Sequence, residues 1–362
     1  MDQVGLRLRG VKLKFCIEIG SNALIDSSPM GLVQRVKQAE EAGVDSVWVS
    51  ENPFHWDAYA VLGSLSMQTS KLKLGTGVSS PYVRPPHLQA MSAVTLDRLS
   101  QGRAFLGLGR GLVQWYRSFL GLNVGDPVSV MEETIDLVRQ WWNEPYHASS
   151  EGYFRVPGLR RAVGGVQSDL PIYIAAVGPR MVRLAARVAD GVVFTWPSPQ
   201  FLEETIKVIY KEMACVGRNP NNFSIVVNTG LQVTDEPEKV LEQLKGRMAS
   251  IHSLPGMDTA LLSSKFDVPR IVSDVRDVLD IRNTLEKGGS LQELNQAINH
   301  DRVRRLIPLG LMDEVAIVGS ADMVRQRLNH YESIGVNNIF VPLPKEETIL
   351  EYTTMISNIG GP

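Results

Sequence analysis

The chain has 362 residues, of which 44% are hydrophobic and 21% are charged, and its formal net charge is −2. This size allows one large α/β barrel or two mid-sized domains, and the nearly neutral charge excludes a general attraction to nucleic acid or anionic membranes. No apolar run reaches the roughly 20 residues of a membrane helix, and the two cysteines lack metal-ligand spacing, which favours a reduced, cytoplasmic setting.

Strand-like apolar runs alternate with helical patterns along the chain. The expected strands are Val11–Ile19, Ser46–Ser50, a run starting at Leu72, Arg103–Leu108, 171–177, 191–196, 223–233 and 337–343. The expected helices are Leu32–Ala42, Ala58–Thr69, His87–Leu99, Val128–Trp142, Arg180–Ala189 and Phe201–Cys215. Short strands that are apolar on both sides and separated by helices indicate a parallel sheet covered on both faces. Eight such units predict a closed α/β barrel, the (β/α)8 TIM barrel.

Two stretches interrupt this alternation. Glu144–Gly164 has loop character and is expected to form a short hairpin around YFRVP. Residues 245–310 are polar and helical, and they are expected to form an insertion near the seventh strand. Such an insertion can cover or dimerise a barrel, or simply add solvent-facing helices. We expect residues 1–362 to form a single barrel domain; a doubly wound open sheet is the alternative, although no GxGxxG opens the first unit.

Candidate site residues are sought at the carboxyl ends of the strands, where barrel enzymes place their active sites. Glu18, in FCIEIGSN, is a carboxylate in an apolar strand. Because such a group is costly to bury, we expect it near the open end of the barrel. There it could act as a general acid. The alternative is a structural ion pair with an arginine or lysine across the barrel.

Other strand ends show weaker signals. In AAVGPRMVRLA, Gly178 precedes a helix whose first turn contains Pro179 and Arg180, a pattern that suits an anion or an ordinary turn. GLGRG, with Gly109 and Arg110, allows close backbone approach to a flat ligand but also describes a tight turn. No Ser-His-Asp order, HExxH or P-loop is present, so a hydrolase or a metal site has no support.

The stretches VWVSENPFHWDAYA, LKLGTGVSSPYVRPPHLQAMSAVTLDRLSQGRAFLGLGRG and PIYIAAVGPRMVRLAARVADGVVF resemble the bacterial luciferase-like superfamily of (β/α)8 flavin and deazaflavin enzymes. The likeness runs from about Lys14 to Pro342. Within the superfamily, the chain is most similar to the methylenetetrahydromethanopterin reductases, which use coenzyme F420. The resemblance therefore implies a TIM barrel, an enzyme, and a homo-oligomer (a dimer or tetramer).

The resemblance also implies roles for individual residues. A non-prolyl cis peptide bond at Gly77–Val78 would lie in a bulge of the third strand and back the tricyclic ring of the coenzyme. Glu18 would be the catalytic, proton-handling group. Residues implied at the coenzyme are Glu51, Asn52, Thr76, Gly77, Val78, Gly109, Arg110, Ala176, Val177, Gly178, Pro179 and Arg180, the last three at its phosphate. Apart from the resemblance, His55 and Tyr82 are predicted at the substrate; His55 lies in HWDAYA, where a histidine and loop aromatics suit a planar ligand or anchor the helix start.

Two departures from the family pattern guide the choice of reaction. Asn52 stands where many relatives have histidine, and Leu112 stands where the sugar-phosphate dehydrogenase branch has glutamate. An alcohol dehydrogenase would lack both of its acid/base groups, whereas reduction with Glu18 remains possible. We therefore expect hydride transfer from reduced coenzyme F420 to a pterin-bound C1 group. The alternatives are a monooxygenase using FMN, a methylenetetrahydrofolate reductase using NAD(P)H, and a barrel that only binds a flavin.

Overall fold

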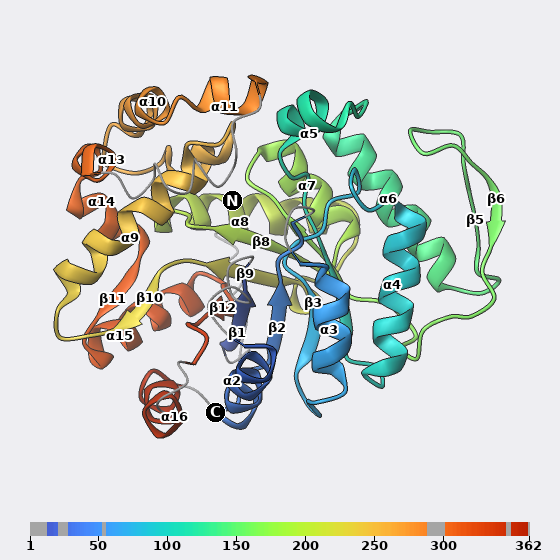
Figure 1. Cartoon of the computed structure of the whole chain (residues 1–362), viewed down its shortest axis with the longest axis horizontal. Coiled ribbons are helices and arrows are strands. Elements are labelled where there is room, and N and C mark those ends of the chain that lie inside the picture. Colours follow the sequence, from blue (N-terminus) through green and yellow to red (C-terminus); the bar gives the residue numbers. More distant parts are fainter. Residues whose placement is uncertain (1–12, 21–27, 53–55, 288–300, 345–348, 361–362) are drawn as a thin grey trace.

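The computed structural model describes residues 13–20, 28–52, 56–287, 301–344 and 349–360. Eight parallel strands close into a barrel (Figure 1), which confirms the predicted (β/α)8 fold. In barrel order the strands are β1 (Lys14–Ile19), β12 (Asn338–Phe340), β9 (Ser224–Asn228), β8 (Gly191–Thr195), β7 (Ile172–Ala175), β4 (Ala104–Leu108), β3 (Lys73–Thr76) and β2 (Ser46–Val49). Each expected strand run contributes one strand to this barrel.

The barrel interior is filled by aromatic side chains. Trp48 on β2 packs against Phe105 on β4, with ring centroids 4.4 Å apart, and against Tyr173 and Phe340 at 5.1 and 5.7 Å. All four residues of β2 and all five of β4 are buried. A filled interior leaves no pore, so a ligand site must lie at an end of the barrel.

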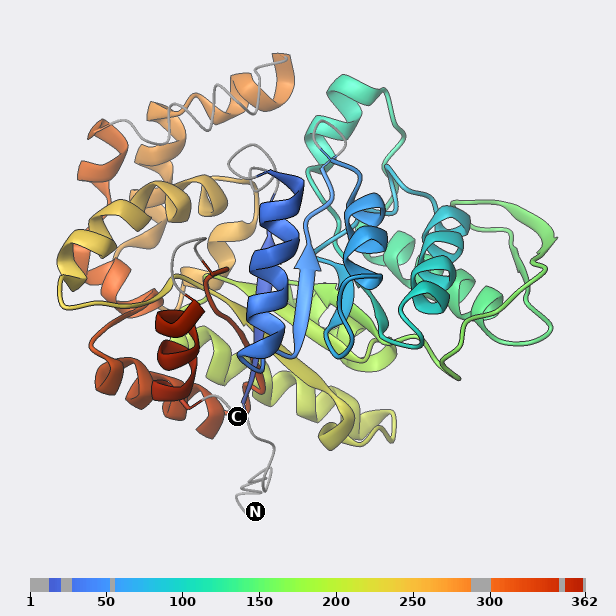
Figure 2. The ribbon, with the colours of Figure 1, turned by 60° about the horizontal axis from the view of Figure 1, so that its bottom comes forward.

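Helices cover the outside of the barrel (Figure 2). They are α2 (Pro29–Glu41), α3 (Ala58–Ser66), α4 (Pro86–Leu99), α6 (Pro127–Trp142), α7 (Pro179–Val188), α8 (Pro199–Cys215), α15 (Ala321–Ser333) and α16 (Ile349–Asn358). Several begin one to three residues before the expected start, because a proline occupies the first helical turn. The sequence did not predict α5 (Val113–Leu120), α15 or α16.

The expected strand 223–233 is wrong as a single strand. It divides into β9, which belongs to the barrel, and β10 (Leu231–Val233), which pairs outside the barrel with β11 (Ile317–Gly319). Gly230 permits the separation, since a Cβ atom there would lie 2.7 Å from the Trp196 ring and 2.8 Å from Leu244. Between β5 (His147–Ser150) and β6 (Val156–Arg160) the structure forms the expected antiparallel hairpin, which extends away from the barrel (Figure 1).

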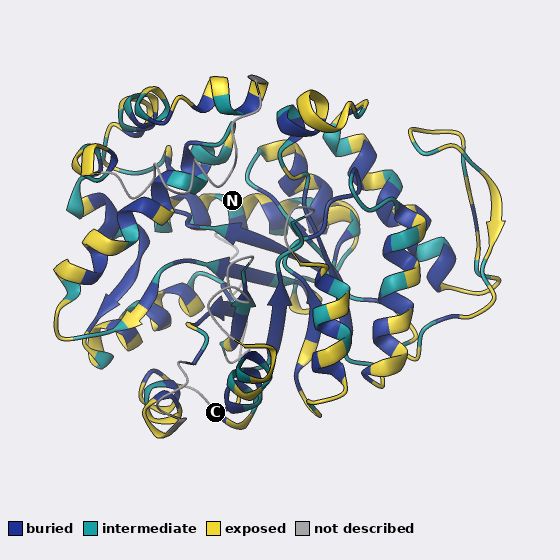
Figure 3. Ribbon diagram, viewed as in Figure 1, coloured by how far each residue is buried: buried dark blue, intermediate teal, exposed yellow. Residues whose placement is uncertain are grey.

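A helical segment connects β10 to β11 and runs beyond both expected ends of 245–310. It contains α9 (Pro237–His252), α10 (Val268–Val278), α11 (Ile281–Lys287), α13 (Asp301–Leu306) and α14 (Leu309–Val315). These helices gather on one side of the barrel (Figure 3), around buried side chains of their own that include Met248, Val272 and Leu311. Helix α9 therefore has a fixed support from which to project side chains toward the barrel.

Candidate active site

A cavity of about 850 Å³ opens at the carboxyl ends of the barrel strands. Its described lining includes residues of β1, β2, β7, β8, β9, β10, β12 and α9, and of the chain after β3. This volume is within the range of small-molecule and cofactor sites. The only charged residues among the described lining are Glu18 and Arg247.

Glu18 lies in this cavity and accepts hydrogen bonds from three side chains. The Ser50 hydroxyl donates to Oε1 at 3.0 Å, and Asn228 Nδ2 donates to Oε2 at 2.9 Å. Arg247 Nη2, from α9, lies 3.0 Å from Oε2. The carboxyl group is thus at the open end, as expected, and it also makes the ion pair that the alternative interpretation described. Because the ion pair itself borders the cavity, it does not remove Glu18 from reach of a ligand.

The wall beside Glu18 is the chain segment of residues 77–79 that follows β3, which we call the bulge. The Gly77–Val78 peptide bond is cis, and both residues line the cavity. The bulge is held on β4 because the Ser79 N–H donates to the Gly107 carbonyl at 2.9 Å and the Gly109 N–H donates to Ser79 at 2.8 Å. A Cβ atom at Gly77 would lie 2.7 Å from Trp48 Cβ, so only glycine fits against Trp48 there.

Thr76 and Gly109 support the bulge from behind. The Thr76 hydroxyl is buried and donates to the Gly107 carbonyl at 2.7 Å. A Cβ atom at Gly109 would lie 2.5 Å from Val78 Cγ2. Neither Thr76 nor Gly109 lines the cavity, so the structure places these two predicted coenzyme contacts as supports of the bulge.

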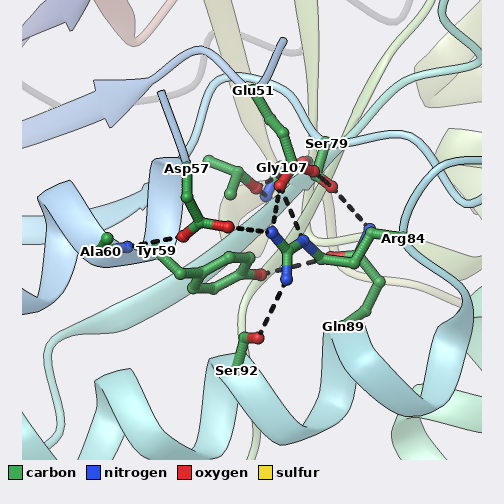
Figure 4. A network of polar contacts seen from close by, with 10 residues as sticks. Glu51, Asp57, Tyr59, Ala60, Ser79, Arg84, Gln89, Ser92 and Gly107 are labelled. Atoms are coloured by element: carbon green, nitrogen blue, oxygen red, sulfur yellow. Dashed lines mark hydrogen bonds and ion pairs between the residues drawn. The ribbon is translucent and has the colours of Figure 1, made fainter. Parts of the chain in front are cut away.

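Glu51 also lies behind the bulge, in a network of polar side chains (Figure 4). Its Oε1 accepts from Arg84 Nε at 2.7 Å, and the Ser79 hydroxyl donates to its Oε2. Gln89 donates to Ser79 at 2.6 Å. Burial alone would lower the pKa of Arg84, but the hydrogen bond and the charge of Glu51 outweigh it and raise that pKa. Glu51 therefore holds the bulge in place from the side away from the cavity.

The predicted phosphate site lies at the start of α7. Gly178 is the residue before the helix, with no side-chain hydrogen bond capping it, and open space lies where its Cβ atom would be. Arg180 is exposed and makes a two-bond ion pair with Asp126, at 2.8 and 2.9 Å, which lowers the pKa of Asp126 to about 2. Ala176 is buried and Val177 half-buried. The residues from 176 to 180 do not line the cavity itself.

The remaining predicted site residues are Asn52, His55, Tyr82 and Arg110, and the described ones among them do not line the cavity. Asn52 is half-buried at the end of a described stretch, and His55 falls outside the described residues. Tyr82 is buried against Tyr116 and Tyr153, away from the cavity lining, and burial raises its pKa to about 12. Arg110 donates to the Pro255 carbonyl and burial lowers its pKa. Tyr82 and Arg110 thus join the barrel to its neighbouring segments.

The predicted site omitted Ser50, Asn228 and Arg247, which contact Glu18 directly. Asn228 ends an apolar barrel strand, so the strand-end rule used for Glu18 also indicates its position, although no role was assigned to it. Arg247 has no comparable signal, because only the tertiary arrangement of α9 brings it to the barrel. Among the described residues, no group of three or more His, Cys, Asp or Glu could hold a metal ion. None of the helices in those stretches has the length and apolar character needed to cross a membrane.

Comparison with known proteins agrees with this geometry. The model of the luciferase-like monooxygenase family matches residues 13–338, so the chain belongs to that family of enzymes, as its motifs predicted. A Mycobacterium tuberculosis protein provisionally named a coenzyme F420-dependent oxidoreductase is 28% identical over 342 residues, covering 91% of this chain and 95% of that protein. The 5,10-methylenetetrahydromethanopterin reductase of Methanolobus tindarius is 28% identical over 323 residues, covering 88% and 92%.

A solved structure extends the comparison to the fold. The coenzyme F420-dependent tetrahydromethanopterin reductase of Methanopyrus kandleri superposes with a TM-score of 0.74 at 23% identity, covering 95% of this chain and 97% of that one. At this identity the likeness supports the barrel fold alone.

Proposed function

We propose that the protein is a reductase that transfers hydride from reduced coenzyme F420 to a pterin-bound C1 group, as a methylenetetrahydromethanopterin reductase does. The observation that carries the proposal is the position of Glu18: a carboxyl group in the wall of a large cavity, next to a backbone bulge. The names of the relatives found by sequence support the same chemistry.

The residues present fit a flat ring bearing an anionic tail. The bulge at Gly77–Val78 offers a side-chain-poor surface against which a ring can lie. The start of α7 offers backbone N–H groups without a side-chain cap, a setting that favours a phosphate. Coenzyme F420, when bound, would supply the hydride.

The protein's part in the reaction is orientation and proton transfer. Glu18 would deliver a proton to a nitrogen of the pterin-bound group, a step of general acid catalysis worth about 10²–10⁴ in rate. Ser50 holds Oε1 and Asn228 holds Oε2, so the carboxyl group has a defined direction. The bulge and α9 limit the cavity on two sides, which would keep the two ligands within reach of one another.

The experiment measures ligand binding and turnover separately. Oxidised coenzyme F420 and FMN are each titrated into the protein, and turnover is followed with reduced coenzyme F420 and methylenetetrahydromethanopterin. We expect F420 to bind, and we expect Glu18→Gln to lose about 10²–10⁴ in kcat with coenzyme affinity nearly unchanged. Exposed Glu332→Gln is the matched control and should behave as the wild type. Tight binding of FMN with no binding of F420 would instead indicate a flavin monooxygenase.

A further inference from the structure

Helix α9 presents a polar stripe to the cavity. Gln243, Arg247 and Ser250 all line it, and their spacing of four and three residues places them on one face of the helix. No other helix contributes a residue to the described lining. The inserted helical segment therefore does more than cover the outside of the barrel, because it supplies part of the ligand-binding surface.

This stripe lies on the β9 side of the cavity. Strands β3 and β9 are four places apart in either direction around the eight-stranded barrel, so they face one another. The bulge follows β3, whereas Arg247 of α9 shares the Glu18 Oε2 atom with Asn228 of β9. A ring lying against the bulge would thus leave its second face toward α9. The ligand next to α9 is then the acceptor rather than the coenzyme.

Most N–H donors of the Arg247 guanidinium group make no hydrogen bond to the described residues. Its guanidinium group has five N–H donors, and within the described residues its one side-chain hydrogen bond goes to Glu18. Its side chain is 55% exposed. Arg103 shows the contrast: its guanidinium donates to Ser66, Thr69, Leu72 and Ser100, as a structural arginine does. Because one side-chain hydrogen bond holds this exposed guanidinium group, another anion can replace Glu18 there without loss of buried structure.

We propose that Arg247 is the anion-binding residue of the acceptor site, and that a carboxylate or phosphate group of the acceptor displaces Glu18 from its guanidinium. The substrate class is thus an acceptor with an acidic group, and its arrival releases Glu18 for proton transfer. Assigning the anion to the acceptor rests on the proposed function, whereas the anion site itself rests on the geometry of Arg247.

Simple anions test the site without the reaction. Glutarate and inorganic phosphate are titrated into the full-length protein by calorimetry at low and high salt. We expect Arg247→Met to weaken binding about ten- to a hundredfold, as loss of a charged hydrogen-bond partner does, and Arg247→Lys to restore most of it. Lys239→Met removes an equal charge from an exposed position of the same helix and should have no effect.

Glu18→Gln supplies a readout that a purely structural Arg247 would not give. Because Glu18 competes for the guanidinium, removing its charge should tighten anion binding about two- to fivefold, the strength of a partly exposed ion pair. Unchanged anion affinity in both Arg247→Met and Glu18→Gln would overturn the proposal.

Titration with oxidised coenzyme F420 separates the two sources of the anion. Coenzyme affinity should be the same in Arg247→Met and wild type; a loss confined to the coenzyme would overturn the assignment to the acceptor. If the wild type binds no F420, but Arg247→Met weakens and Glu18→Gln tightens glutarate binding, the proposed function is refuted and the anion site is supported. If the wild type turns over the pterin acceptor, but Arg247→Met binds glutarate as tightly as the wild type, the anion site is refuted and the proposed function is not.

Discussion

Replacement of Arg84 by methionine should destabilise the protein strongly, because it leaves Glu51 without a cation. Only 7% of the Glu51 side chain and 17% of the Arg84 side chain are exposed, so water cannot replace the lost partner. Breaking a buried ion pair in this way costs about 3–5 kcal/mol. The variant also loses the ion pair of Arg84 with Asp57 and the contact of the guanidinium group with the Tyr59 ring, 4.9 Å from the ring centroid. The expected cost is therefore in the upper part of that range.

The assay is differential scanning calorimetry at neutral pH. With an unfolding entropy of roughly 2.1 cal/mol/K per residue, a chain of 362 residues should lose about 4–7 °C in Tm for that cost. Arg270→Met is the matched control: its side chain is 79% exposed and lies 3.9 Å from Asp274, so its removal should shift Tm by less than about 1 °C.

A double-mutant cycle separates the ion pair from packing. Glu51→Gln removes the charge that Arg84 neutralises, so Glu51→Gln combined with Arg84→Met should be less destabilising than the sum of the two single changes. Additive effects, or an Arg84→Met variant as stable as the control, would refute the reasoning that this pair holds the bulge.

Three further changes test other parts of the structure. Burial lowers the pKa of His252 from its ordinary 6.5 to about 4. The contribution of neutral His252 to the free energy of unfolding is therefore fully present above about pH 6.5 and is lost as the pH falls toward 4. Between pH 7 and pH 5, the free energy of unfolding measured in urea should fall by about 2 kcal/mol more in the wild type than in His252→Gln. Gly109→Ala would force Val78 to move, since the new Cβ atom would lie 2.5 Å from it, and should weaken ring-ligand binding in a titration about tenfold. Gly63→Ala is the matched control and should leave binding unchanged, because its new Cβ atom would lie 4.0 Å from the nearest atom, Leu99 Cδ1. Arg180→Ala should leave Tm within about 1 °C of wild type because its pair with Asp126 is exposed, but it should weaken binding of the phosphate-bearing coenzyme if α7 receives that group.

The barrel could be predicted from the sequence because its determinants are local. Each strand is a short apolar run, such as Val47–Val49, and most runs are followed by a helix whose start is indicated by proline or a capping residue such as Asp57 or Ser198. The position of Glu18 followed from the cost of burying a carboxylate in such a strand. The cis peptide bond at Gly77–Val78 was expected from the family likeness and is present in the structure.

The surroundings of Glu18 were decided by tertiary structure. Arg247 lies 229 positions away in the sequence and 3.0 Å away in space, on a helix that leaves the barrel after Gly230 and returns over its open end. The family likeness implied Glu51 at the coenzyme, and the tertiary structure pairs its carboxylate with Arg84, 33 positions away in the sequence. Hydrophobic periodicity determines which segments become strands and helices, because it acts between near neighbours. The partner of each charge depends on how those segments pack, because burial and charge pairing act through space.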